Sequence, residues 1–267
     1  MHYPLLEGQM YTDDIRELEV RLHDGDMLNF AAAGIQGNVI RFASELNDIP
    51  NPLGLAHSGL VVVATPREIS GVIDYLSNPA NYDLDYRPQP EALMLMRESL
   101  RGYHSNTLIP FCLEASGTAG QVLQGINPHV QITPLEQVIR DYDGNVYVRQ
   151  LRVQVPHCKM IDFIKCNLVR PYEGLNSFTE LAKSTLKLNQ TEDTRKVFCS
   201  ELAALFYRQA IGLNIKCVSD VIPEEFGSGA GIHDILRGKA GAEIALKQKF
   251  VYHDEDPDQN CCPCLLL

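Results

Sequence analysis

Short runs of β-branched and apolar residues alternate with helix-like segments along most of this chain. Residues 58–64, SGLVVVA, are bounded by glycine and proline and are typical of a buried strand. Residues 108–115 and 145–155 have the same character, and a shorter strand is predicted at 130–133. Because helices do not follow these strands in a regular strand–helix–strand repeat, the pattern predicts an α+β fold in which helices pack against an antiparallel sheet.

The strongest helix is predicted at residues 198–211, ahead of Gly212. Leu202, Leu205 and Phe206 recur there at the spacing of one buried helix face. The same periodicity predicts further helices in the rest of the chain. They cover residues 12–22, 37–47, 67–76, 89–101, 134–140, 157–169 and 177–188.

The length of 267 residues suffices for one domain with a substantial core. We expect residues 1–253 to form that domain. Within it, residues 66–107 comprise two helical stretches around a loop rich in Tyr, Asp, Asn and Pro, and we interpret them as a helical insertion or lid. Residues 254–267 are expected to form a flexible acidic tail.

The composition excludes several classes of protein. A net charge of −11 argues against a nucleic-acid partner, because neutralising phosphates requires a clustered basic face. The first 20 residues lack the basic start and apolar core of a secretory signal, so synthesis in a cytosol is expected. No apolar run approaches the roughly 18–20 residues that span a bilayer.

The cysteines in the body of the chain have no paired spacing and are expected to be reduced. These are Cys112, Cys158, Cys166, Cys199 and Cys217.

Cys199 is the candidate nucleophile because it lies near the start of the strongest predicted helix. A nucleophilic cysteine must be largely thiolate near neutral pH, and a helix N-terminus together with a nearby imidazolium lowers the thiol pKa. A cysteine at a helix start can also be a small packed residue.

The glycine-rich segment 227–231 lacks the strand and the Lys-Ser/Thr of a phosphate-binding loop, and we predict neither a metal nor a cofactor.

His57 and Glu114 are the candidate partners of this cysteine. His57 lies at the mouth of a predicted strand, where rigid backbone holds an imidazole beside a cleft. Glu114 lies near the end of a second predicted strand, which can pair with the strand of His57. A carboxylate beside the imidazole, as the third group of such a site, fixes the imidazole tautomer. Taken singly, each has an ordinary structural interpretation. The other histidines lie in turns or near the termini and are expected to be solvated: His2, His23, His104, His129, His157, His233 and His253.

Three segments together resemble a known family. AHSGLVVV with His57, FCLEASG with Glu114 and VFCSELAALFY with Cys199, preceded by GDML at residues 25–28, are similar to the circularly permuted branch of the NlpC-type papain-like hydrolases, with the YiiX-like subgroup nearest. Ordinary papain-like enzymes place the cysteine before the histidine, whereas this chain has the permuted order. The resemblance covers residues 24–212. The long stretch between His57 and Glu114 and the extension after Cys217 depart from the pattern.

The resemblance implies a permuted papain-like fold with Cys199 as nucleophile, His57 as general base and Glu114 as the orienting residue. It implies acyl transfer at an amide or ester bond through a thioester. The backbone N–H of Cys199 is one natural oxyanion donor, and the sequence selects no side-chain donor. Permuted relatives include lipid acyltransferases and phospholipases, which favours a lipid substrate by analogy of fold. A peptidase, deamidase or amidase acting on a protein, or a catalytically silent module that binds lipid or protein, stay open as alternatives.

The chain ends with a pattern for lipid attachment. Cys264 stands fourth from the end, as C-a-a-X prenylation requires, and the final leucine favours a geranylgeranyl group. One lipid gives weak anchoring, so Cys261 and Cys262 are candidates for palmitoylation. A chance apolar tail, or a metal or redox pair formed by Cys261 and Cys264, is the alternative.

Prenylation takes place in eukaryotic cytosol, and the expected partners are therefore a prenyltransferase and the cytoplasmic face of a membrane. Together with a fold of bacterial type, the prenylation motif fits either a eukaryotic protein or a pathogen effector delivered into a host cytosol. The sequence leaves both origins open.

We expect a Cys264→Ser variant to move from the membrane fraction to the soluble fraction of eukaryotic cells, because the prenyl acceptor is lost. Cell fractionation followed by immunoblotting, with the wild-type chain in parallel, measures the change. Unchanged partitioning would eliminate the lipidation hypothesis.

Overall fold

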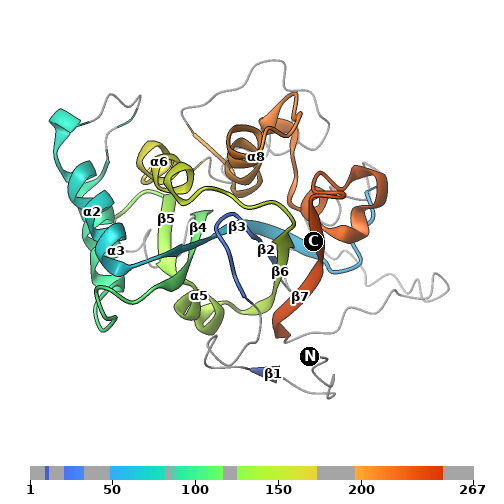
Figure 1. Cartoon of the computed structure of the whole chain (residues 1–267), viewed down its shortest axis with the longest axis horizontal. Helices are drawn as coiled ribbons and strands as arrows, with labels where there is room; N and C mark the ends of the chain where they lie inside the picture. Colours follow the sequence, from blue (N-terminus) through green and yellow to red (C-terminus); the bar gives the residue numbers. More distant parts are fainter. Residues whose placement is uncertain are drawn as a thin grey trace, which may run out of the picture.

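The computed structural model describes residues 10–11, 21–32, 49–81, 86, 88–116, 125–172 and 196–248. Seven strands within these residues form one sheet in the order β1-β7-β6-β2-β3-β4-β5 (Figure 1). All neighbouring strands are antiparallel. The strands are β1 Met10–Tyr11, β2 Met27–Ala32, β3 Leu55–Ala64, β4 Ile109–Ser116, β5 His129–Pro134, β6 Gly144–Leu151 and β7 Ala240–Gln248. The predicted α+β class with an antiparallel sheet is confirmed.

The α-helices of the described residues follow most of the predicted ranges. They are α2 Pro66–Ser77, α3 Pro90–Ser99, α5 Leu135–Asp141, α6 His157–Asn167 and α8 Cys199–Ala210. Short 3₁₀ turns are η2 Pro79–Asn81, η3 Val218–Asp220, η4 Pro223–Phe226 and η5 Ser228–His233. The helices predicted at 37–47 and 177–188, and most of the one at 12–22, lie outside the described residues.

Two features of the sheet differ from the sequence-based expectation. The strand predicted at 145–155 ends at Leu151, because the chain bends there and Val155 packs into the core ahead of Pro156. The extension after Cys217, which has no counterpart in the expected pattern, contributes β7 to the sheet beside β6. The sheet is therefore completed by the part of the chain that the family resemblance leaves out.

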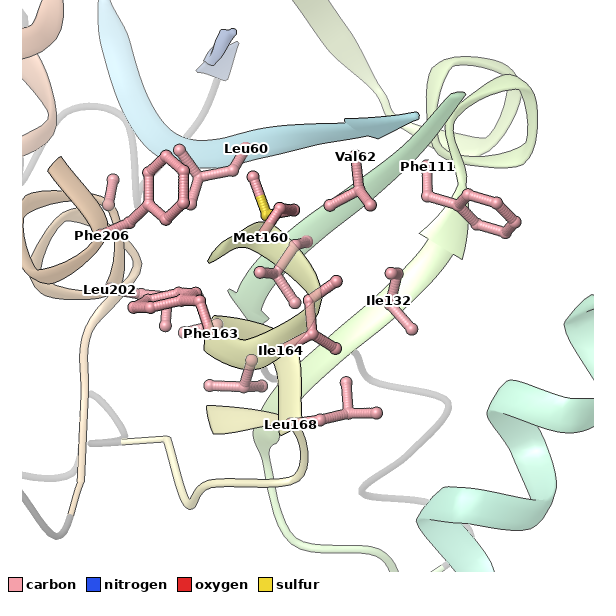
Figure 2. Packing of buried hydrophobic residues seen from close by; sticks show 14 of the residues in the cluster. Leu60, Val62, Phe111, Ile132, Met160, Phe163, Ile164, Leu168, Leu202 and Phe206 are labelled. Atoms are coloured by element: carbon pink, nitrogen blue, oxygen red, sulfur yellow. The ribbon is translucent and has the colours of Figure 1, made fainter. Parts of the chain in front are cut away.

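Two apolar clusters flank the sheet, since successive residues of a strand point to opposite faces. Met27 belongs to the larger cluster and Leu28 to the smaller one, which includes Leu135 of α5. In the larger cluster, side chains of β3, β4 and β5 pack against α6 and α8 (Figure 2). The labelled residues of that packing are Leu60, Val62, Phe111, Ile132, Met160, Phe163, Ile164, Leu168, Leu202 and Phe206.

The segment 66–107 shares this larger cluster. Thr65 and Glu68 form a capping box at the start of α2, and Ile69 and Ile73 of that helix are fully buried. Leu93 of α3 belongs to the same cluster. The two helices therefore contribute to the common core, and the interpretation of 66–107 as an insertion or lid stays a prediction.

The start of β2 is tied to the rest of the fold by a turn. Gly25 adopts a φ of +83°, which favours glycine, and its carbonyl accepts a hydrogen bond from the Tyr207 hydroxyl of α8 at 2.9 Å. The buried carboxylate of Asp26 accepts the backbone N–H groups of His23 at 2.9 Å and Leu151 at 2.8 Å. This turn thus connects α8 to the middle of the sheet.

A buried arginine connects the sheet to the C-terminal part of the described chain. Arg149 of β6 makes a bidentate pair with Asp234, at 2.8 and 2.9 Å, and both side chains are almost fully buried. Its guanidinium also donates to the carbonyls of Phe226 at 2.6 Å and Gly241 at 2.9 Å. The turns η4 and η5 are therefore held against β6 by charge-assisted hydrogen bonds.

An Arg149→Met variant should lose about 3–5 kcal/mol of unfolding free energy, because the Asp234 carboxylate would stay buried without its partner. Urea unfolding measures the loss. The matched control is Arg140→Met, which breaks an exposed pair with Asp141 and should change stability by less than about 1 kcal/mol. Equal losses in the two variants would contradict the importance assigned to the buried pair.

Candidate functional site

Cys199 is the first residue of α8, and it is 7% exposed. Glu201 Oε2 accepts the backbone N–H of Phe198 at 2.7 Å, and the Ser200 hydroxyl donates to the carbonyl of Val221 at 2.7 Å. Both contacts fix the first turn of the helix. The sulfur is therefore held in the positive field of a helix N-terminus, as the sequence predicts.

His57 lies on β3, directly after a β-bulge. Phe30 of β2 is paired with His57, but the next residue of β2, Ala31, is paired with Leu55, so Ala56 is an extra residue in β3. Bulges re-aim side chains and occur often beside functional sites. The imidazole packs against the Phe30 ring with the centroids 5.1 Å apart, and its side chain is 19% exposed. The ring is thus held on one side and accessible on another.

Glu114 of β4 lies beside the imidazole. Its Oε2 atom is 2.5 Å from His57 Nε2, and its Oε1 atom accepts a hydrogen bond from Gln131 Nε2 at 2.9 Å. Gln131 is opposite Glu114 in the pairing of β4 and β5. The carboxylate is therefore fixed from both sides, and the imidazole takes its orientation from the carboxylate.

Cys199 is the second group that acts on this imidazole, through its charge and a hydrogen bond. Burial by itself lowers the pKa of His57. The negative charge of Cys199 and a hydrogen bond with Cys199, and after them the hydrogen bond and charge of Glu114, outweigh burial and raise the pKa to about 10. Because Nε2 is engaged by Glu114, Nδ1 is the ring nitrogen left for the sulfur. The imidazole is thus held protonated at neutral pH between a sulfur and a carboxylate.

The charge of Glu114 is stabilised in the same network. Burial would raise the pKa of its carboxyl, but the hydrogen bond and charge of His57 and the hydrogen bond from Gln131 hold it below its usual value. The structure therefore brings together Cys199, His57 and Glu114, which lie far apart in the sequence. Their catalytic roles stay a prediction.

The other cysteines in the body of the chain have different surroundings. These four and Cys199 are all free thiols. Cys112 is fully buried in β4, where burial raises the pKa of its thiol well above the usual value. Cys158 and Cys166 are exposed on α6, and Cys217 is half-buried. Cys112 is an inert core residue, since a buried thiol in apolar surroundings stays protonated.

Two side chains of the site were not predicted from the sequence. Gln131 was missed because only the pairing of β4 with β5 places it opposite Glu114. Tyr172 follows α6, and its ring contacts the ring of Phe198, the residue before Cys199, in an edge-to-face arrangement with centroids 5.9 Å apart. No strand or helix pattern covers Tyr172 in the sequence, so no signal pointed to it.

The expectation that the remaining histidines are solvated is wrong for His129. This residue is buried at the start of β5, where its Nδ1 atom is 2.7 Å from the carbonyl of Asn127. His157 is half-exposed, but it bonds Asp24 at 2.7 Å and Glu68 at 3.3 Å. His129 is also paired with Ser116 of β4 and bridged to Pro171. Periodicity does not reveal such contacts between distant segments.

The tail cysteines Cys261, Cys262 and Cys264 lie outside the described residues. Within the residues that the structure describes, no group of three or more His, Cys, Asp or Glu side chains is arranged to hold a metal ion. The described helices also include none with the length and apolar character needed to cross a bilayer.

Comparisons with protein-family models and with curated proteins find no match to this chain. The function proposed below therefore depends on the geometry of the site and on the sequence resemblance.

A His57→Gln variant should lose most stability below pH 6.5, and the loss should shrink as the pH rises towards 10. A pKa raised from 6.5 to about 10 on folding contributes stability that is present below the lower value and lost through the higher one. Urea unfolding of both proteins between about pH 6 and pH 10 measures the difference. Lost packing adds a constant offset, so a difference that does not vary with pH would contradict the raised pKa. His104→Gln, on an exposed loop, is the control for removing a histidine.

Proposed function

We propose that this protein is a cysteine hydrolase or acyltransferase that acts at amide or ester bonds, with Cys199 as nucleophile, His57 as general base and Glu114 as the orienting residue. The observation that carries the proposal is the double engagement of His57, by Glu114 at 2.5 Å and by the sulfur of Cys199. An imidazole between a thiol and an orienting group is the arrangement that nucleophilic thiol catalysis needs.

The chemistry follows from these positions. The Cys199 thiolate attacks the carbonyl carbon of the substrate, a C–S bond forms, and the carbonyl electron pair moves to oxygen. When the carbonyl re-forms, the bond to the leaving group breaks, and the leaving group takes a proton from the His57 imidazolium. Water or another acceptor then gives a proton to His57 and attacks the thioester. Glu114 stabilises the charged imidazole throughout.

A circularly permuted papain-like fold is the architecture we propose. Three features support it: the order of His57, Glu114 and Cys199 in the chain, the antiparallel sheet, and the position of Cys199 at the start of a helix that packs against that sheet. In this arrangement β3 and β4 supply the base and its partner, whereas α8 supplies the nucleophile.

We propose a lipid acyl group as the favoured substrate. Lipid attachment at Cys264, with Cys261 or Cys262 as second acceptor, would hold the site near a bilayer. This step depends on the predicted lipidation and on the analogy with permuted lipid enzymes, so a peptidase or deamidase acting on a protein is the alternative within the same chemistry.

A silent binding module is the alternative from a different class. Such a module would gain nothing from burying a charged imidazole beside a carboxylate, since a buried ion pair is weak support for stability. Functional sites often contain groups with strongly shifted pKa values, as His57 has here. The arrangement therefore favours a catalyst.

Labelling with iodoacetamide at about pH 6–7, followed by peptide mass spectrometry, tests the proposal. Cys199 should react first although it is 7% exposed, ahead of the exposed Cys158 and Cys166. An unperturbed thiol is only a few per cent thiolate at pH 7, so His57→Ala should slow labelling of Cys199 by about tenfold or more.

Cys158 and Cys166 serve as internal controls in both proteins, because their labelling should not change with the His57 substitution. Uniform and slow labelling of all cysteines would reject the enzyme in favour of the silent module. Selective labelling of Cys199 that is insensitive to His57→Ala would reject the role assigned to the histidine.

A further inference from the structure

The imidazole of His57 has a fully buried aromatic neighbour in the adjacent strand. Phe30 of β2 is paired with His57 of β3 and belongs to the smaller apolar cluster of the sheet. The centroids of the two rings are 5.1 Å apart, and their planes are inclined by 51°. Directly opposed residues of antiparallel strands have Cβ atoms about 5 Å apart, so each side chain limits the positions of the other. The position of the imidazole therefore depends on the position of the Phe30 ring.

The Phe30 ring is itself closely confined. The ring of Tyr142, the residue that ends α5, contacts it edge-to-face with the centroids 5.0 Å apart. Gly59 of β3 lies so close that a Cβ atom there would be 3.5 Å from Phe30 Cε2 and 2.9 Å from the sulfur of Cys112. The ring thus fits between Tyr142, the imidazole and the backbone of β3.

Tyr142 is anchored in turn by the last strand of the sheet. Its carbonyl accepts a hydrogen bond from the ammonium group of Lys247 of β7, which also donates to the carbonyl of Ile139 at 2.8 Å. Lys247 is buried, and a buried ammonium group needs such acceptors. A series of contacts therefore runs from Lys247 through Tyr142 and Phe30 to the imidazole.

The imidazole needs a restraint of this kind because it has two partners. Glu114 is 2.5 Å from Nε2, and Cys199 forms the second hydrogen bond of the ring. A ring attached at Cβ and bound at Nε2 can still turn about the line that joins these two atoms, and this rotation moves Nδ1. Hydrogen bonds weaken steeply as they depart from linearity. The bond to Glu114 alone therefore does not fix the bond to Cys199.

We propose that Phe30 is a positioning residue that fixes the plane of the His57 imidazole, with Tyr142 as its support. The fixed plane directs Nδ1 to Cys199 while Nε2 binds Glu114. The inference rests on the thiol chemistry proposed above and adds to it a residue that takes no part in the bond changes. The smaller apolar cluster thereby acquires a role in the site besides stability.

The titration of His57 separates this role from a structural one. Phe30→Leu keeps an apolar side chain and removes the flat ring. An imidazole that is free to turn loses part of the contribution of Cys199, the larger of the two that raise the pKa of His57 to about 10. We expect the midpoint to fall by about one pH unit, which is tenfold in proton affinity. NMR of the imidazole carbons measures it, with His57→Gln to assign the signals.

The labelling of Cys199 is the second readout. Because the thiolate depends on the neighbouring imidazolium, Phe30→Leu should slow the reaction with iodoacetamide at about pH 6–7 by up to about tenfold. The exposed Cys158 is the internal control. The matched variant is Phe111→Leu, the same change at a fully buried ring of the larger cluster, which should alter neither readout.

A second variant decides the matter if Phe30→Leu does not fold. Tyr142→Leu changes a half-buried residue and leaves Phe30 in place, and the midpoint of His57 should fall by a smaller amount. An unchanged midpoint in the variant that folds would overturn the proposal. Equal falls in Phe30→Leu and Phe111→Leu would also overturn it, because the effect would then be a general loosening of the core.

A lower midpoint with unchanged labelling of Cys199 would overturn the proposal as well, because the plane of the imidazole would then not matter to the thiolate. Failure of the proposed function has a different signature. In that case wild-type Cys199 would react with iodoacetamide no faster than Cys158, whatever the titrations of the variants show.

Discussion

The hydrogen bond between His57 Nε2 and Glu114 determines what the rest of the site can do. By engaging one ring nitrogen, it leaves Nδ1 for the sulfur of Cys199, and it stabilises the positive charge that the sulfur favours. The bond joins two neighbouring strands, β3 and β4, and Gln131 of β5 supports it from the third. The geometry of the proposed catalytic site is therefore a property of the sheet, and the helix contributes only the proposed nucleophile.

The C-terminal part of the described chain supports the start of α8, where Cys199 lies, from the other side. Arg149 holds the carbonyl of Phe226 and the carboxylate of Asp234, and a few residues earlier the carbonyl of Val221 accepts the hydroxyl of Ser200. The start of α8 is thus connected to β6 through one continuous stretch. The residues that the family pattern leaves out fix the neighbour of Cys199 in place.

Much of the fold and the core of the candidate site could be predicted, because both leave local marks in the sequence. Glycine, proline and β-branched residues mark β3 and β4, and helical periodicity marks α8 with Cys199 at its start. The contributions of Gln131 and Tyr172 could not be predicted, because they depend on strand pairing and on a bridge to Val197. The strand β7 was missed for the same reason, since its partner β6 is nearly a hundred residues away.

The extra residue Ala56 interrupts the regular pairing of β2 with β3, and it does so directly next to His57. A chain without it would pair β2 and β3 with no interruption, and the sheet itself would gain an orderly ladder. The same deletion would remove the bulge next to His57 and change the direction in which its imidazole points. Length changes are therefore tolerated less at this point than substitutions are, and divergence in this strand is expected to proceed by exchange of side chains at constant length.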